Sequence, residues 1–147
     1  MRVVLQRVTH SEVSVDGTTI GEIKQGLNLL VGFGKENPEP DLKKMAEKIC
    51  HLRIFPDDEG RFHHSVLDIN GSILAVPQFT LYGQTDRGRR PDFFSALEPE
   101  KASLLFDQFV EELKSYPLNS VQTGEFGAYM QVTIGNDGPV TLVLTDR

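Results

Sequence analysis

The sequence predicts an α+β domain in which a mostly antiparallel, curved or barrel-like β-sheet packs against two main helices. Short β-rich runs separated by turn residues fill most of the chain, and two separate stretches carry apolar residues at helical spacing. The length of 147 residues, with 39% hydrophobic residues, is enough to bury one ordinary core. We therefore expect a single domain over residues 1–147.

The N-terminal part of the chain has the pattern of an antiparallel meander. Asp16-Gly17 separates two β-rich runs, and this pair readily adopts the positive φ angles of a tight type I′ turn. A hairpin is therefore predicted at this position. The predicted strands of the region are Val3 to Val8, Val13 to Val15, Ile20 to Ile23 and Leu27 to Phe33.

A first helix is predicted from about Asp41 to Leu52, after the break at Pro38 and Pro40. Apolar residues recur there at three- and four-residue spacing and form one buried stripe. Cys50 lies on this stripe, where a free cysteine usually packs as a small hydrophobe. The stripe consists of Leu42, Met45, Ala46, Ile49, Cys50 and Leu52.

A second hairpin is predicted around Asn70-Gly71, a pair that strongly favours a two-residue turn. Its arms are expected at Val66 to Ile69 and at Ser72 to Leu81. Within the second arm, Ile73 to Val76 is nearly all apolar, so this strand is expected to be central in the sheet.

The remaining elements are a second helix and three strands. Pro99 suits the first position of the helix, because proline is tolerated where the N–H has no partner. The tail strands are expected at Ser120 to Gly124, Tyr129 to Ile134 and Val140 to Thr145, with the last two joined by a turn at residues 136–139. The predicted buried face of the helix is Leu104, Leu105, Phe106, Phe109, Val110 and Leu113.

Composition excludes several classes of protein. No apolar run approaches the roughly 18 to 20 residues of a membrane-spanning helix, and the first residues lack the apolar core of a signal peptide. The single cysteine excludes an internal disulfide and a multi-cysteine zinc cluster, which fits a reducing cytoplasm. Adjacent His63 and His64 point to opposite faces of an extended strand, so we expect no metal site, and no cofactor is indicated.

The segment Gln78-Phe79-Thr80 is the first candidate site, because an apolar strand runs into an amide, a ring and a hydroxyl. Polar groups at a strand end often line a pocket, although Thr80 also simply suits a strand and Gln78 can face water. A threonine hydroxyl needs a base to become a nucleophile, and no histidine lies nearby in the sequence.

Two further features have both a functional and an ordinary interpretation. The turn at Gly138-Pro139 can present backbone carbonyls outward, or it is an ordinary loop whose proline begins a strand. With a formal net charge of −6, any nucleic-acid partner must be held by a local basic patch. Arg87, Arg89 and Arg90 are the candidates, although such charges are more often a solvated surface.

Three motifs in order resemble the D-aminoacyl-tRNA deacylase family over essentially the whole chain. They are Leu5-Gln6-Arg7-Val8, Pro77-Gln78-Phe79-Thr80-Leu81 and Asn136-Asp137-Gly138-Pro139-Val140-Thr141. Connecting segments agree as well: Arg53-Ile54-Phe55, Gly88-Arg89-Arg90-Pro91, Gln122-Thr123-Gly124 and Met130-Gln131-Val132.

The resemblance implies an esterase that acts on the bond between a D-aminoacyl group, or Gly mischarged on tRNA, and the terminal adenosine of tRNA. Gln78, Phe79 and Thr80 match the residues that line the family's ester pocket, where the N–H of Phe79 can stabilise an oxyanion. Thr80 matches a position once favoured as the nucleophile. We prefer the family's second mechanism, in which the 2′-hydroxyl of the tRNA activates water.

The resemblance also implies a homodimer with active sites at the subunit interface. Gly138-Pro139 matches a cis turn that enters the partner's site, holds the substrate's α-amino group and excludes L side chains, and Arg7 matches the residue that braces it. Pro77 and Met130 complete the expected substrate-binding set.

The chain departs from the family pattern at Pro77, where the family usually has serine. Proline removes a backbone donor and a hydroxyl beside the pocket. Related deacylases that clear L-Ala from mischarged tRNA carry Pro-Gln here but alter the Gly-Pro turn, which is intact in this chain. One alternative is therefore relaxed chirality with L-Ala-tRNA as substrate, and another is a non-catalytic RNA-binding module.

Overall fold

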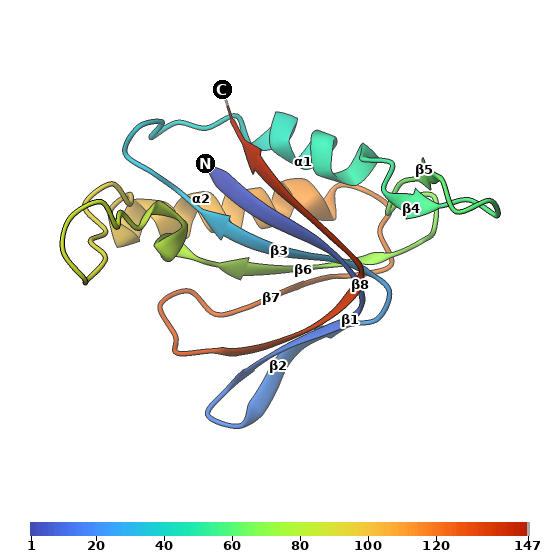
Figure 1. Ribbon diagram of the computed structural model, residues 1–147, viewed down its shortest axis with the longest axis horizontal. Coiled ribbons are helices and arrows are strands. Elements are labelled where there is room, and N and C mark those ends of the chain that lie inside the picture. The colour runs from blue at the N-terminus through green and yellow to red at the C-terminus, as the bar shows by residue number, and fades with distance from the viewer. Residues whose placement is uncertain (147) are drawn as a thin grey trace.

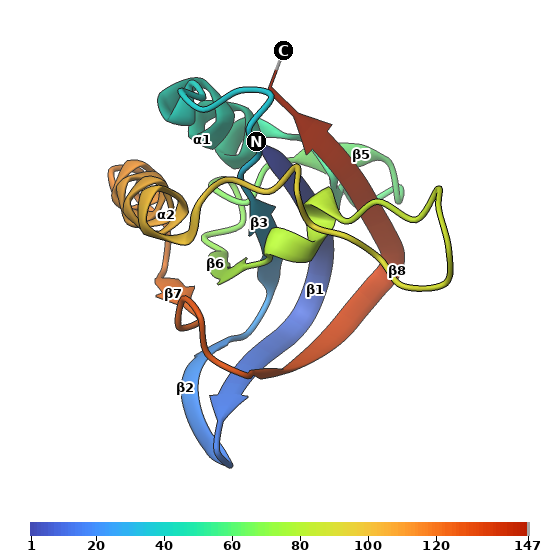
Figure 2. The same cartoon turned by 90° about the vertical axis from the view of Figure 1, so that its left-hand side faces the viewer.

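A computed structural model describes residues 1–146, in which a strongly curved sheet carries both helices on one face (Figures 1 and 2). The predicted α+β class, with a barrel-like sheet and two main helices, is confirmed. The strand order is β2-β1-β3-β6-β7, and β8 pairs with β1. Pairs between β1 and its neighbours are antiparallel, whereas β6 is parallel to both β3 and β7.

Strand β1 (Arg2–Val15) connects the whole sheet, because it pairs with β2 (Thr18–Ile23), β3 (Gly26–Gly32) and β8 (Gln131–Thr145). The first two predicted strands are therefore one continuous strand. The turn after it has positive φ at both Asp16 and Gly17, 49° and 77°, as a type I′ turn requires, so the first predicted hairpin is confirmed.

The second predicted hairpin is wrong. Residues 66–69 form a turn in which the carboxylate of Asp68 accepts from the Ser65 N–H and the Ser65 hydroxyl accepts from the Asp68 N–H. Strand β6 (Ser72–Pro77) then pairs with β3 and β7 (Val121–Thr123), and its residues Ser72 to Val76 are buried. It is central as predicted, but it ends at Pro77, and Phe79–Tyr82 form a 3₁₀ helix, η1.

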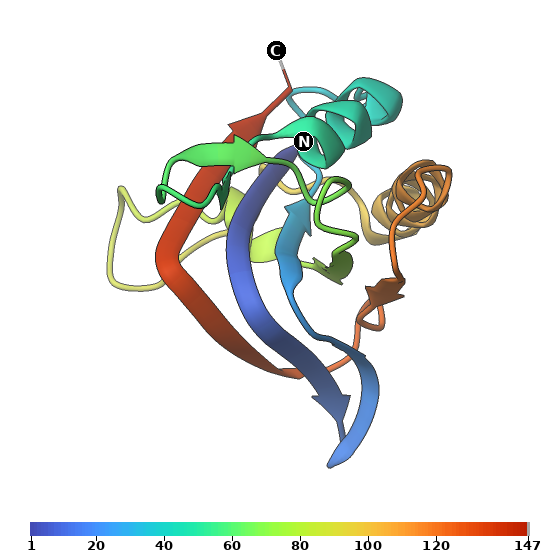
Figure 3. The same cartoon turned by 90° about the vertical axis from the view of Figure 1, so that its right-hand side faces the viewer.

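The two predicted strands at the C-terminal end are one strand, β8, which pairs with β1 on both sides of residues 136–139. These residues are therefore not the tip of a hairpin. Since Gln6 pairs with Thr141 and Val8 with Asn136, Arg7 alone lies opposite the four residues from 137 to 140. We call these four residues, Asp137 to Val140, the β8 bulge, and the strand bends sharply in this part of Figure 3.

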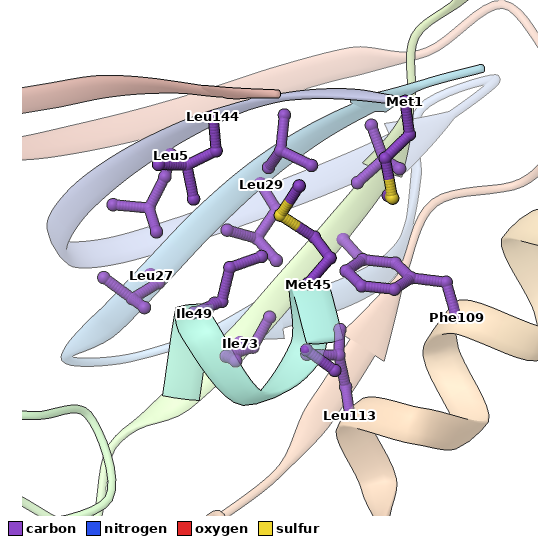
Figure 4. Close-up of a cluster of buried hydrophobic side chains, with 14 of the residues drawn as sticks. Met1, Leu5, Leu27, Leu29, Met45, Ile49, Ile73, Phe109, Leu113 and Leu144 are labelled. Atoms are coloured by element: carbon purple, nitrogen blue, oxygen red, sulfur yellow. The ribbon is translucent and has the colours of Figure 1, made fainter. Parts of the chain in front are cut away.

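Helix α1 (Leu42–His51) begins and ends close to its predicted limits, and helix α2 (Pro99–Lys114) begins at the predicted Pro99. The carboxylate of Asp41 caps α1 by accepting from the N–H of Lys44 at 2.9 Å. Both helices pack on the sheet through apolar side chains, as Figure 4 shows for Met45, Ile49, Phe109, Leu113, Leu27, Leu29 and Ile73. No helix in residues 1–146 is long and apolar enough to span a membrane.

Two sequence-based expectations about the helices have different outcomes. Cys50 is fully buried, as expected, and this burial raises the pKa of its thiol to about 12. Leu104, by contrast, was expected on the buried face of α2 but is 58% exposed. The buried face is instead built from Ala102, Phe106, Phe109, Val110 and Leu113.

A separate two-stranded hairpin, β4 (Phe55–Pro56) and β5 (Phe62–His64), follows α1. In Figure 3 this green hairpin lies beside the ends of β1 and β8 that carry the chain termini. A second apolar cluster lies on the sheet face opposite the helices, where Val8, Leu74 and Val76 pack with Met130 and Val132. This cluster forms part of the base of the site described below.

Candidate active site

The segment that follows β6 is placed at the sheet's edge by its backbone. The N–H of Gln78 donates to the carbonyl of Val31 at 2.8 Å, which continues the parallel pairing for one more residue. Gly32 permits this approach, because a Cβ there would lie 2.7 Å from the carbonyl oxygen of Gln78. The chain then turns into η1, so that Phe79 and Thr80 are exposed at the end of a buried strand.

Tyr82 anchors η1 to the rest of the fold. Its ring is buried, fills the space beside Gly34, and lies 4.3 Å from the guanidinium carbon of Arg2. Burial, followed by the nearby charge of Glu36, raises the pKa of Tyr82 to about 12. Arg2 also donates to the carbonyl of Leu81 at 3.1 Å, so the position of η1 is held from two sides.

Phe79 and Thr80 line a pocket of about 790 Å³, a size suitable for a nucleoside with a small attached group. Pro77, Gln78 and Met130 line the same pocket. The other lining residues come from β3, from the segment 93–102 and from the segment before β8, and include Val31, Phe33, Phe93, Phe94, Ala96, Leu97, Pro99, Ala128, Tyr129 and Val132.

Aromatic rings form much of the pocket's rim. Phe79 and Phe93 pack edge to face with ring centroids 5.1 Å apart, while Phe94 and Tyr129 are 81% and 93% exposed. Exposed aromatic faces bind flat apolar ligands such as nucleobases by stacking. The rim therefore suits a nucleoside better than an aliphatic ligand.

The Thr80 hydroxyl is not hydrogen-bonded to a base within residues 1–146. The side-chain amide of Gln78 donates to the Thr80 hydroxyl oxygen, and an amide N–H cannot accept a proton in return. Among the described lining residues the ionisable groups are Lys35, Glu98 and Tyr129, and the first two form an ion pair of 3.0 Å. Backbone N–H groups at the start of η1 remain as potential donors, since the Gln78 side chain does not cap the helix.

The β8 bulge is the second candidate feature. Its Gly138-Pro139 peptide bond is cis, and both residues are exposed. Arg7 holds the bulge from beneath: its Nε donates to the carbonyl of Asp137 at 3.1 Å and lies 3.2 Å from that residue's carboxylate. The Arg7 side chain is itself 9% exposed, so this ion pair is shielded from water on one side.

The three arginines of the predicted basic patch lie on one exposed loop. Backbone bonds between Gln84 and Asp92 close this loop, at 2.9 and 3.0 Å. Arg87, Arg89 and Arg90 are all exposed, and none forms an ion pair within residues 1–146.

His63 and His64 lie in β5, with ring centroids 4.8 Å apart, and neither lines the pocket. The described residues contain no group of three or more acidic, histidine or cysteine side chains that could hold a metal ion.

The order of motifs along the chain is that of a known family. A model of the family described as D-Tyr-tRNA(Tyr) deacylase matches residues 4–145. The chain belongs to this family. The resemblance seen in the sequence is thereby confirmed.

Individual members of the deacylase family are similar over their whole length. A D-aminoacyl-tRNA deacylase of Clostridium botulinum (strain 657 / Type Ba4) is 54% identical over 147 residues, which are 100% of this chain and 98% of that protein. The D-aminoacyl-tRNA deacylase of Thermosipho africanus (strain TCF52B) is 50% identical with the same coverage.

Solved structures share the fold. The c-Myc DNA Unwinding Element Binding Protein superposes with a TM-score of 0.89 and 41% identity, covering 100% of this chain and 99% of that one. A probable eukaryotic D-amino acid tRNA deacylase has a TM-score of 0.83 over 97% of both chains, and at 18% identity it supports the fold alone.

The deacylase-family residues predicted from the sequence form two separate groups in the chain. Pro77, Gln78, Phe79, Thr80 and Met130 line one pocket. The other group, Arg7 with Gly138 and Pro139, meets at the β8 bulge and does not line that pocket.

Sequence reasoning missed three residues near these features. Phe94 and Tyr129 are at the pocket's mouth, and Phe62 lies over Arg7. Exposed aromatic residues in polar segments were the available signal, but nothing in the sequence indicates which of them converge.

Proposed function

We propose that the protein is a hydrolase that cleaves the ester bond between a D-aminoacyl group and the terminal adenosine of tRNA, and that it also releases Gly mischarged on tRNA. Membership of the deacylase family, with relatives of that name at 54% and 50% identity, supports this activity. The observation that carries it is the aromatic-rimmed pocket around Gln78 to Thr80, whose hydroxyl is hydrogen-bonded to an amide and whose one carboxylate, Glu98, is paired with Lys35.

In this proposal the adenosine stacks in the pocket and its aminoacyl ester lies against the start of η1. The 2′-hydroxyl of the tRNA activates the attacking water, because Thr80 has no partner that could take its proton. The N–H of Phe79 donates to the oxyanion that develops on the ester carbonyl. The protein supplies position and hydrogen bonds, and the substrate supplies the acid–base group.

Rejection of L-amino acids is proposed to come from Gly138-Pro139 of a second subunit in a homodimer. Backbone carbonyls of the bulge would bind the α-amino group, and the space beside them would admit only the side chain of a D-residue. A backbone filter of this kind tests the configuration at Cα and ignores the side chain. Three observations support this arrangement. The bulge is exposed, Arg7 holds it in place, and it does not line the pocket of its own chain.

The rest of the tRNA is proposed to lie against the loop that carries Arg87, Arg89 and Arg90. Arginines bind phosphate oxygens, and these three have no ion-pair partner within residues 1–146. Such a patch would offset the net charge of −6, which otherwise repels a polyanion. We place the enzyme in the cytoplasm as a single domain.

Release of amino acid from D-Tyr-tRNA and L-Tyr-tRNA tests the function. We expect release from the D form alone, measured as initial rates with labelled tyrosine. Equal rates on both forms would contradict the chirality filter. Binding of tRNA without cleavage of either form would instead support the RNA-binding alternative.

The variant Gly138→Ala tests the filter. Gly138 has φ of +123°, and an added Cβ would lie 3.1 Å from Nη2 of Arg7, so either the bulge or the guanidinium that holds it must shift. We expect the ratio of D to L cleavage to fall about tenfold or more, because a backbone filter depends on its exact placement. The control is Gly17→Ala, which adds a Cβ at a similarly positive φ of +77° but meets nothing within 4 Å.

One observation favours a second substrate. Pro77 stands in the pocket wall and offers neither the hydroxyl nor the backbone N–H of serine. L-Ala-tRNA should therefore be included in the same assay. Preferential cleavage of L-Ala-tRNA would establish the activity with relaxed chirality. If D-Tyr-tRNA is cleaved and L-Ala-tRNA is not, this activity is excluded.

A further inference from the structure

The β4–β5 hairpin contacts the same guanidinium that holds the β8 bulge. Nη1 of Arg7 donates to the carbonyl of Ile54, immediately before β4, at 2.6 Å, and this bond is buried. Nε of the same side chain contacts Asp137 at 3.1 Å, and Nη2 lies beside Gly138. The Arg7 guanidinium is therefore hydrogen-bonded both to the start of the hairpin and to the bulge.

The ring of Phe62, in β5, lies over the Arg7 guanidinium. Its ring centroid lies 5.8 Å from the guanidinium carbon of Arg7, within the range of a cation–π interaction. The ring is 59% exposed, so burial alone does not account for an aromatic residue at this position. The position over Arg7 gives this exposed ring a physical role, because it restricts the directions in which the guanidinium can move.

The hairpin itself is held firmly enough to keep the ring in place. One oxygen of the Asp57 carboxylate accepts from the N–H groups of Glu59 and Arg61, both at 2.9 Å. Its other oxygen accepts from Nε of Arg61 at 3.1 Å. Pro56 and Phe62 are cross-strand partners, so this closed turn fixes the start of β5 and with it the ring.

We propose that Phe62 is a specificity-determining positioning residue, whose ring holds the Arg7 guanidinium against the carbonyls of Ile54 and Asp137 and thereby sets the position of Gly138-Pro139. This inference rests on the proposed role of the bulge as the filter against L-aminoacyl-tRNA. Phe62 acts through Arg7 and has no contact with the reacting ester in its own pocket. Its loss should therefore affect the rejection of L substrates more than the cleavage of D substrates.

The experiment compares Phe62→Ala, Phe62→Leu and Phe62→Tyr with wild type on D-Tyr-tRNA and L-Tyr-tRNA. We expect Ala and Leu to lower the D-to-L ratio of kcat/KM by about two- to fivefold, the size of an exposed cation–π contact. Tyr keeps the ring and should retain the wild-type ratio. The kcat for D-Tyr-tRNA should change less than twofold in all three.

The matched control is Leu104→Ala, which truncates an apolar side chain of nearly the same exposure, 58%, that does not line the pocket. It should leave the ratio unchanged. An unchanged ratio in Phe62→Ala would overturn the proposal, and so would a wild-type ratio in Phe62→Leu. A ratio that falls only in step with the melting temperature would also overturn it.

Gly138→Ala, measured in parallel, distinguishes a failure of the Phe62 proposal from a failure of the proposed role of the bulge. If Gly138→Ala loses discrimination while the Phe62 variants keep it, the filter stands and Phe62 has no part in it. If neither Gly138→Ala nor Phe62→Ala changes discrimination, the bulge is not the filter and the proposed function fails in that respect.

Discussion

At the scale of single residues, the Thr80 hydroxyl is already engaged. The Gln78 amide donates to its oxygen, so the hydroxyl can still donate its own proton to a substrate but meets no group that would remove it. A threonine in this setting positions a ligand or a water molecule. Nucleophilic attack would require a base at the Thr80 hydroxyl, and the one carboxylate among the described lining residues, Glu98, is paired with Lys35.

The substitution Thr80→Val, which removes the hydroxyl and keeps the shape, should lower the single-turnover rate on D-Tyr-tRNA by no more than about tenfold, the effect of one lost hydrogen bond. A loss of about a million-fold, as for a removed nucleophile, would contradict the substrate-assisted mechanism. Thr80→Ser distinguishes the two mechanisms further, because serine keeps a nucleophilic hydroxyl but lacks the methyl group of threonine. A tRNA ending in 2′-deoxyadenosine should be cleaved far more slowly by every variant.

The sequence identified Gln78 to Thr80 because a polar group at the end of an apolar strand is a local signal. It could not place Phe94 or Tyr129 at the same pocket, since these residues reach it from segments that lie far along the chain. Phe62 was missed for a similar reason. Its relation to Arg7 depends on a hairpin packing beside β1, which no local pattern encodes.

At the scale of elements, the predictions were correct for turns and helices, which depend on neighbouring residues. They were wrong where strands pair with partners distant in the chain. The type I′ turn at Asp16-Gly17 and the limits of both helices follow from neighbouring residues. Asn70-Gly71 gave an equally strong hairpin signal, but β6 pairs instead with β3 and β7 in parallel, where its apolar residues are buried on both faces. The turn residues 136–139 were taken for a strand break because a bulge and a loop have the same composition.

Helix α2 shows the same limit on a smaller scale. Leucines at 104 and 105 have equal hydrophobicity, yet the face that reaches the sheet is set by Phe106, Phe109 and Leu113. Leu104 lies on the side of the helix that faces away from the sheet. Apolar residues on a helix therefore predict its buried face only where they keep the spacing of a single stripe.

We expect Phe109→Ala to lower the free energy of unfolding by about 3–5 kcal/mol, because it leaves a cavity in the core between α2 and the sheet. Leu104→Ala should change it by no more than about 0.5 kcal/mol. Urea unfolding followed by circular dichroism measures both. A comparable loss in the two variants would mean that Leu104 is covered in solution by another surface.

At the scale of the whole molecule, the pocket and the bulge are separate surfaces of one chain. The pocket lies at the end of β6, and the bulge lies in the middle of β8 across from Arg7. A mechanism that needs both at one ester therefore requires a second copy of the chain. On this view the dimer is part of the chemistry.

Mixed dimers test this requirement. Ala128→Trp fills the pocket of one subunit, since Ala128 is part of its lining, and its partner carries Gly138→Ala. The only open pocket then faces an intact bulge from the blocked subunit. We expect this mixed dimer to reject L-Tyr-tRNA like wild type, whereas the Gly138→Ala homodimer does not, as measured on dimers purified through two different affinity tags.

A reverse arrangement serves as the control. When both substitutions lie on one chain and the partner is wild type, the open pocket faces a defective bulge and should accept L-Tyr-tRNA. If discrimination follows the chain that owns the pocket in both arrangements, the filter acts within one subunit.

The β8 bulge also has a consequence for the dynamics of selection. A loop has a free tip that samples positions on nanosecond to microsecond timescales, but the bulge is bounded by paired residues on both sides, Asn136 with Val8 and Thr141 with Gln6. A large displacement of the bulge therefore requires the ladder to β1 to open, which is a rarer local unfolding event. If this surface is the filter, as proposed, an L-aminoacyl group cannot push it aside during a brief encounter, and selectivity should persist on warming until the sheet itself begins to open.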